Sequence, residues 1–129
     1  MKDKLTTALY TVLRVGAGLL FMQHGAQKLF GWLGGRGPVE LFSMMGVAGV
    51  VEFFGGLLMV LGLFVLPVGA IMAIQMVVAH FMAHQPQGGL PIQNGGELAL
   101  MYALVFAYLA VRGGGPVSLD ARIFAARGR

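Results

Sequence analysis

Cysteine is absent from this chain, and charged residues make up only 11% of its 129 positions. Without cysteine the protein cannot form a disulfide, use a thiolate nucleophile or hold an iron–sulfur cluster through sulfur ligands. Any redox chemistry would therefore need a bound cofactor, a metal or a partner subunit. A typical soluble domain is about 25% charged, so the shortage of charge argues against a soluble protein.

Hydrophobic residues are abundant instead and account for 57% of the chain. This composition is typical of an integral membrane protein, and the length suits one compact domain over residues 1–129. The net charge is +4, but the basic residues flank apolar segments and do not form a patch with aromatic residues. We therefore expect a lipid membrane around the protein and no nucleic-acid partner.

Four apolar segments predict an all-α fold. They cover about residues 5–30, 47–65, 67–83 and 95–111, and a tail follows over 112–129. An α-helix rises about 1.5 Å per residue, so the second and third segments reach about 25–28 Å, just enough to span the hydrocarbon layer. The fourth is short for a span and would need local thinning of the bilayer or contact with neighbours. The prediction is an integral membrane four-helix bundle with four transmembrane helices.

Two shorter helices are expected outside these segments. Within the long connection 31–46, Val39 to Met45 is a candidate for a short interfacial helix. In the tail, Ser118 is placed to cap a short helix with an apolar face toward lipid and with Arg122 and Arg127 toward water.

Small residues recur at every fourth position on the last two apolar segments. The rows consist of Gly69 with Ala73, and of Ala99, Ala103 and Ala107. Such rows let transmembrane backbones approach closely, so these positions predict close helix packing.

Lys and Arg are divided unevenly between the two sides of the predicted bundle. One side holds Lys28 and Arg36. The side with both termini holds Lys2, Lys4, Arg112, Arg122, Arg127 and Arg129. Cytoplasmic connections carry the excess of Lys and Arg, so we expect both termini in the cytoplasm of a bacterium and a location in its inner membrane.

The first apolar segment carries three ionisable residues, Arg14, His24 and Lys28. At about 100° per residue they fall within an arc of about 80° on one side of a helix. Ionisable groups facing lipid cost about 3 kcal/mol or more each, so this side must face other helices. Glu52 in the second segment is expected to pair with Lys28 or His24. Such a pair is either structural, fixing helix register, or part of a ligand site.

Glu97 and the third segment offer further polar candidates. The spacing from Asn94 to Glu97 resembles a capping box at the start of the fourth helix, and capping alone would explain Glu97. The alternative is a share in a ligand site near the outer surface.

Met76, His80 and His84 recur every fourth residue, and two His at this spacing can hold a metal, with Met suiting copper. No acidic or cysteine ligand lies nearby in the sequence, so the metal pattern is incomplete.

Four short motifs follow one another along the chain. They are Arg14 with His24-Gly25-x-x-Lys28; Gly49-Val-Val-Glu52-Phe-Phe-Gly55-Gly56 with Leu61-Gly62-Leu63; Asn94-Gly-Gly-Glu97-Leu-Ala-Leu; and Gly114-Gly115-Pro116-x-Ser118-Leu119-Asp120. In this order they resemble the DoxX family of small four-helix bacterial membrane proteins. The ending departs from the family pattern, because it reads Gly-Gly-Gly-Pro where Gly-Pro-Gly is more usual, and this affects a turn.

The resemblance implies a link to quinone-dependent membrane oxidoreductases that handle thiosulfate, thiols or oxidative stress. We expect a membrane subunit of such an enzyme, with quinone as its cofactor and with a partner oxidoreductase subunit or a homo-oligomer. Four residues are candidates for binding a quinone or a small anion near the outer face: His24, Lys28, Glu52 and Glu97. Four others are expected to be structural: Arg14, Asn94, Ser118 and Asp120. The alternative function is a non-enzymatic membrane scaffold or a carrier of a small solute.

Overall fold

Helices make up all the regular structure of the chain, whose computed structural model describes residues 1–125. In chain order the helices are α1 (Lys2–Phe30), α2 (Met44–Leu61), α3 (Val65–Ala79), α4 (Pro91–Asn94), α5 (Glu97–Arg112) and α6 (Leu119–Ala125). After α3 the helix continues through a π-helical turn, His80–His84, and a 3-10 turn, Gln85–Gln87. The all-α prediction is confirmed.

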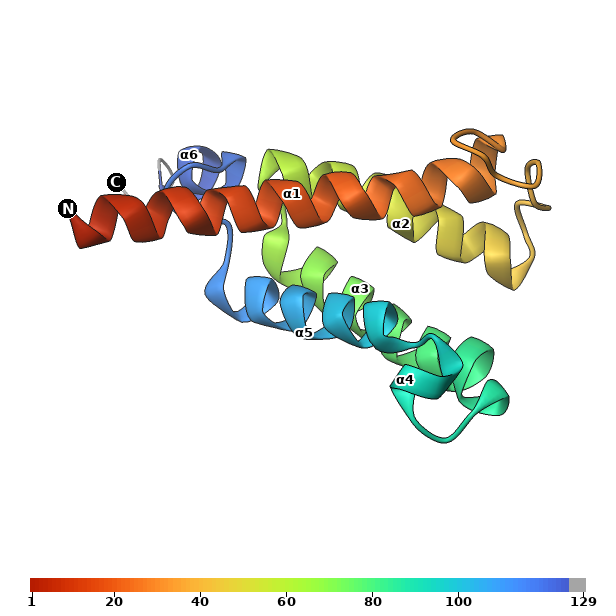
Figure 1. Ribbon diagram of the computed structural model, residues 1–129. Coiled ribbons are helices and arrows are strands. Elements are labelled where there is room, and N and C mark those ends of the chain that lie inside the picture. The colour runs from red at the N-terminus through yellow and green to blue at the C-terminus, as the bar shows by residue number, and fades with distance from the viewer. Residues whose placement is uncertain (126–129) are drawn as a thin grey trace.

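The four long helices form two packed pairs, α1 with α2 and α3 with α5 (Figure 1). Glycines bring α1 and α2 together: a Cβ atom on Gly18 would lie 2.7 Å from the carbonyl oxygen of Gly56. In the other pair, a Cβ atom on Gly69 would lie 3.0 Å from the Ala110 side chain. Ala99 and Ala103 are buried as expected, whereas Ala107 is exposed. Small residues therefore set the close approach within each pair.

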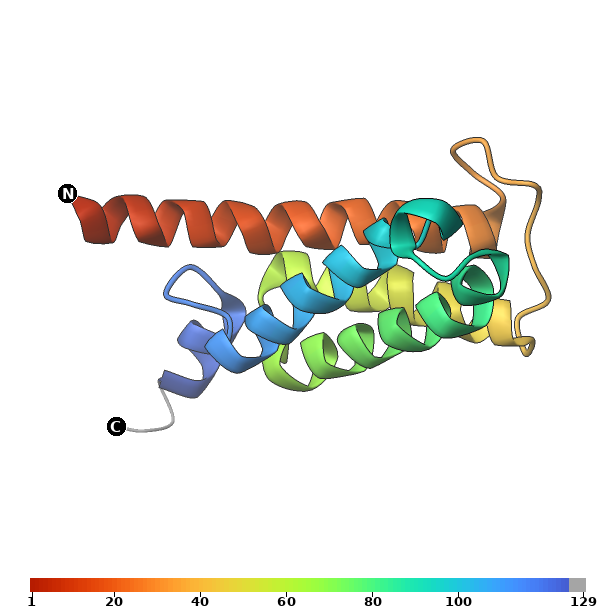
Figure 2. The ribbon, with the colours of Figure 1, turned by 60° about the horizontal axis from the view of Figure 1, so that its bottom comes forward.

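The two pairs are joined at the α2–α3 corner and diverge toward the other end of the molecule (Figure 1). That other end carries residues 31–43 and α4. Figure 2 shows α3 and α5 side by side beneath the long α1. The core between the pairs is formed by large apolar side chains, namely Phe21, Met59, Val65, Met72, Phe106 and Leu109.

Three helices are long and apolar enough to cross a membrane: α1, α2 and the continuous helix Val65–Gln87. Many of their large apolar side chains are exposed; Ile74, for example, is 64% exposed. Lipid, unlike water, favours such a surface. With 16 residues, α5 is shorter than these three helices.

Arg14 is buried where α1 passes the end of α2. Its guanidinium donates hydrogen bonds to the carbonyl oxygens of Met59 (2.5 Å) and Val60 (2.9 Å) in the last turn of α2. It also donates to the carbonyl oxygen of Val117 at 2.6 Å. Because the last carbonyl groups of a helix have no partner within it, a cation suits this place.

The segment after α5 returns to the same α2–α3 corner. The Asp120 carboxylate accepts hydrogen bonds from the backbone N–H groups of Phe64 (2.8 Å) and Val65 (3.0 Å), where α3 begins. Ser118 Oγ accepts from the N–H of Ala121 at 3.1 Å, so the predicted cap of the tail helix is confirmed. Hydrogen bonds at this one corner therefore account for the structural roles expected for Arg14, Ser118 and Asp120.

The interfacial helix expected over Val39 to Met45 is wrong. Residues 31–43 form turns and extended chain, and Val39 donates a hydrogen bond to the carbonyl oxygen of Lys28 at 2.8 Å. Ser43 caps α2, because its Oγ accepts from the N–H of Gly46 at 3.1 Å. The chain thus folds back on the end of α1 before α2 begins.

The capping box expected from Asn94 to Glu97 is also wrong. Gly96 is the residue before α5, and Asn94 ends the short α4. The Asn94 side chain accepts from the N–H of Gly96 at 2.8 Å and donates to the carbonyl oxygen of Gly88 at 2.9 Å. Asn94 is structural as expected, but it holds a loop together. Arg127, the other cation predicted on the tail helix, lies outside the described residues.

Candidate functional site

A cavity of about 450 Å³ lies between the two helix pairs, in the part of the molecule where they diverge. Its walls come from α1, α2, α3 with its π-helical turn, and α5. Most of the lining is apolar, and several walls are methionine side chains. The polar lining residues are His24, Lys28, Glu52, Gln75, His84 and Tyr102. A mostly apolar cavity with a few convergent polar groups is typical of a small-molecule site.

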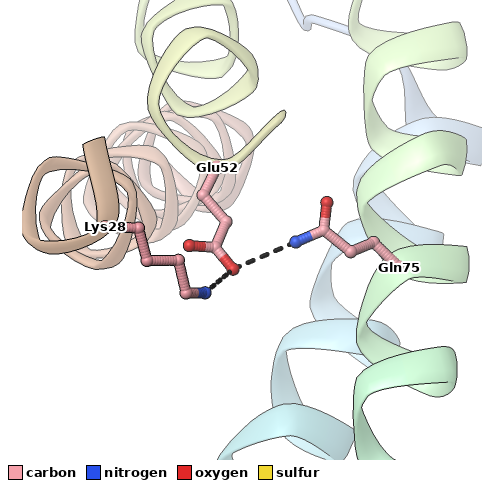
Figure 3. A network of polar contacts seen from close by, with 3 residues as sticks. All are labelled: Lys28, Glu52 and Gln75. Atoms are coloured by element: carbon pink, nitrogen blue, oxygen red, sulfur yellow. Dashed lines mark hydrogen bonds and ion pairs between the residues drawn. The ribbon is translucent and has the colours of Figure 1, made fainter. Parts of the chain in front are cut away.

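Glu52 is the centre of the polar part of this cavity and is only 2% exposed. Its Oε1 accepts hydrogen bonds from Lys28 Nζ at 2.5 Å and from Gln75 Nε2 at 3.0 Å (Figure 3). Lys28 comes from α1 and Gln75 from α3, so the carboxylate connects three helices. The expected pairing of Glu52 is confirmed with Lys28 as the partner.

The second carboxylate oxygen, Glu52 Oε2, is buried and has no hydrogen-bond partner among residues 1–125. Buried polar atoms in native proteins are nearly always paired. This oxygen is enclosed by protein, so only a rotation of the Glu52 side chain would bring it to a molecule in the cavity.

His24 lies on the cavity wall one helical turn before Lys28. Its ring packs edge-to-face against Tyr102, with centroids 6.0 Å apart. Tyr102 in turn packs against Phe21, at 5.1 Å between centroids. The site therefore combines an imidazole and an ammonium group with aromatic surface, which suits a flat polar ring.

His80 and His84 lie in the π-helical turn that follows α3, and their stacked rings have centroids 6.3 Å apart. His84 lines the cavity, and its Nδ1 is 3.2 Å from the carbonyl oxygen of Asn94. His80 is buried, and its Nδ1 has no partner in the described part of the chain. Within residues 1–125 no group of three or more His, Cys, Asp or Glu is arranged to hold a metal. A metal site at this place would therefore have only His80 and His84 as His, Cys, Asp or Glu ligands from residues 1–125.

Glu97 is exposed in the first turn of α5 and does not line the cavity. The structure thus brings together His24, Lys28 and Glu52 but not the fourth predicted residue. Gln75 and Tyr102 were missing from the predicted set. Gln75 could have been included, because a polar amide inside the apolar segment 67–83 indicates a side chain that faces a polar site. A tyrosine in a membrane helix gives no such indication.

Long apolar helices around a polar cavity define a multi-pass membrane protein. The model of the DoxX family matches residues 9–85, which include His24, Lys28, Glu52 and Gln75. A Haemophilus influenzae protein described as uncharacterized is 39% identical over 119 residues, covering 87% of this chain and 88% of that protein. This chain belongs to the DoxX family. No solved structure matches it.

Proposed function

We propose that this protein is the membrane subunit of a quinone-linked oxidoreductase and that the cavity binds the quinone headgroup. The observation that supports this most directly is the mostly apolar cavity in which His24, Lys28 and Glu52 converge. An amphiphile with a polar ring fits such surroundings better than a fully polar solute does. A small anion such as thiosulfate fits less well, because Lys28 is already neutralised by Glu52 and a carboxylate repels an anion.

The polar side chains of the cavity have different roles in the proposed quinone chemistry. Lys28 or His24 donates a hydrogen bond to a quinone oxygen. Glu52 exchanges one of the two protons that accompany reduction or oxidation of the ring, and His24 exchanges the other. Reduction of a quinone to a quinol consumes two electrons and two protons. The chain has no cysteine, so the electrons come from a partner subunit or from a soluble reductant such as a thiol or thiosulfate.

The proposal includes a location in the bacterial inner membrane with four transmembrane spans. At about 1.5 Å per residue, α5 is about 24 Å long, and it packs along α3 for its length. The uneven distribution of Lys and Arg favours cytoplasmic termini. The cavity then lies in the outer half of the membrane, near the periplasmic face.

Binding of quinone to the purified protein tests the proposal. A ligand that binds only the folded state raises thermal stability by mass action, so added quinone should raise Tm in a dose-dependent way. Glu52→Gln and His24→Ala should each remove most of this shift. Glu97→Gln is the matched control, since it makes the same chemical change outside the cavity, and it should keep the shift.

Two results would contradict the proposal. One is a Tm that no quinone changes. The other is an equal shift in the wild type and in Glu52→Gln. A stable oligomer that binds no quinone would favour the alternative, a non-enzymatic scaffold or a carrier of a small solute. A shift produced by copper or zinc and lost in His84→Ala would instead favour a metal site at His80 and His84.

A further inference from the structure

A second hollow, of about 340 Å³, lies on the surface between α1 and α5. The backbones of these two helices lie apart, because each packs mainly against its own partner, and ring contacts such as Phe21 with Tyr102 bridge them. The hollow is almost entirely apolar. Its lining consists of Val12, Leu13, Gly16, Ala17 and Leu20 from α1 and Leu98, Met101, Tyr102 and Val105 from α5. We call it the α1–α5 groove.

The groove adjoins the cavity, because Leu98 and Tyr102 line both spaces. On α1 the cavity residues Lys28, His24 and Phe21 are followed, toward the N-terminus, by the groove residues from Leu20 onward. At about 1.5 Å per residue, the distance along α1 from Lys28 to Leu13 is about 22 Å. Cavity and groove thus follow one another along α1, with the charged side chains gathered at the cavity end.

Gly16 makes the groove wider without serving helix packing. A Cβ atom at Gly16 would have nothing within 4 Å. At Gly18 and Gly25 of the same helix, a Cβ atom would collide with the α2 backbone, so those glycines are required for the close α1–α2 contact. Glycine lowers helix stability relative to alanine. A glycine at position 16, with no neighbour to accommodate, therefore leaves space that an occupant from outside the chain can use.

We propose that the α1–α5 groove holds the hydrocarbon tail of an amphiphile whose polar head occupies the cavity, and that this ligand enters sideways from the membrane between α1 and α5. This inference rests on the proposed headgroup site. An isoprenoid quinone is a ligand of this class. A partner helix on the groove would not explain why the groove adjoins the cavity, whereas an amphiphile requires both parts.

Lipid already solvates a hydrocarbon tail, so the groove supplies little hydrophobic free energy. It supplies van der Waals contact for a tail that must leave the cavity toward lipid. Filling the groove should therefore hinder a tailed ligand by steric collision and leave a tail-less headgroup unaffected.

The experiment compares a tail-less quinone with the same headgroup carrying a long isoprenoid tail, using protein in lipid nanodiscs. In Gly16→Leu the affinity for the tailed quinone should fall by about tenfold, the size of a typical overpacking effect. Its affinity for the tail-less quinone should stay within about twofold. Ala107→Leu is the matched control, because it places the same leucine side chain at an exposed α5 position outside the groove. Val105→Trp fills the groove from α5 and replaces Gly16→Leu if that variant does not fold.

The outcomes separate this inference from the proposed function. If the wild type binds neither quinone, the headgroup site itself is wrong. If both quinones bind and Gly16→Leu weakens neither, the groove does not hold the tail. The remaining exit would then be the side lined by Met44, Met45 and Met82. If Gly16→Leu instead disrupts an oligomer in native mass spectrometry and leaves both affinities unchanged, the groove is a contact between copies.

Discussion

Glu52 shows how one residue connects stability with ligand binding. One of its oxygens is held by Lys28 and Gln75, and the other has no partner in the described chain. The hydrogen bonds to the first oxygen compensate for burying a charge, and the second oxygen is buried without one. A purely structural ion pair would gain from satisfying both oxygens. The two roles left open by the sequence are therefore compatible in one side chain.

The Lys28–Glu52 pair leads to a prediction at this scale. Lys28→Met leaves a buried carboxylate without its cation and should lower the free energy of unfolding by about 3 kcal/mol. Glu52→Gln should also destabilise the protein. The double variant should lose clearly less than the sum of the two single losses, because neither charge then remains unpaired. Unfolding in mixed detergent measures all four proteins, and strictly additive losses would show that the pair contributes no interaction energy.

At the scale of elements, the α2–α3 corner is a joint assembled from distant parts of the chain. Arg14 of α1 binds the last carbonyl groups of α2, and Asp120 binds the first N–H groups of α3. Arg14 also binds the carbonyl oxygen of Val117, which connects the joint to the segment after α5. The joint holds the helix pairs together at one end and leaves the other end free to diverge around the cavity.

The cap formed by Asp120 can be tested by removing it. Asp120→Ala leaves the N–H groups of Phe64 and Val65 without their acceptor and should lower stability by about 1–2 kcal/mol, as expected for a lost helix cap. Hydrogen exchange at these two amides should accelerate. Asp3→Ala is the control, since Asp3 is an exposed carboxylate in the first turn of α1, and it should cost only a few tenths of a kcal/mol. Unchanged protection of the α3 amides in Asp120→Ala would contradict the cap.

At the scale of the whole molecule, the number of spans determines where the two ends of the chain lie. Three helices are long and apolar enough to cross, and α5 is the shorter fourth. Four crossings put both termini on the same side of the membrane, and three put them on opposite sides. The proposed site depends on this arrangement, because α5 forms one wall of the cavity and of the groove.

The absence of cysteine makes this topology directly measurable. Single variants Phe42→Cys and Gly89→Cys, in the two connections at the diverging end, should react with a membrane-impermeant maleimide in intact cells. Asp3→Cys and Ala125→Cys should react only after the membrane is permeabilised. Reaction of Ala125→Cys together with Gly89→Cys in intact cells would mean that α5 does not cross.

The sequence by itself determined the features that depend on neighbouring positions along the chain. Apolar segments predicted the long helices, and helical periodicity put Arg14, His24 and Lys28 on one side of α1. The cost of a charge in lipid required a partner for Glu52. Helix ends were less predictable. α2 ends at Leu61, and Gly62 after it takes a left-handed conformation with φ 68°. α3 begins at Val65, before the expected start at Pro67.

Only the tertiary structure decided which of these residues meet. Gly18 and Gly56 bring α1 and α2 into close contact, and this geometry selects Lys28 over His24 as the partner of Glu52. The packing of α3 against α5 adds Gln75 and Tyr102 to the cavity. Glu97 remains outside, because it lies on the exposed side of the first turn of α5, whose Leu98 and Ala99 line the cavity. Helix crossing depends on contacts between positions far apart in the chain, which periodicity and composition do not encode.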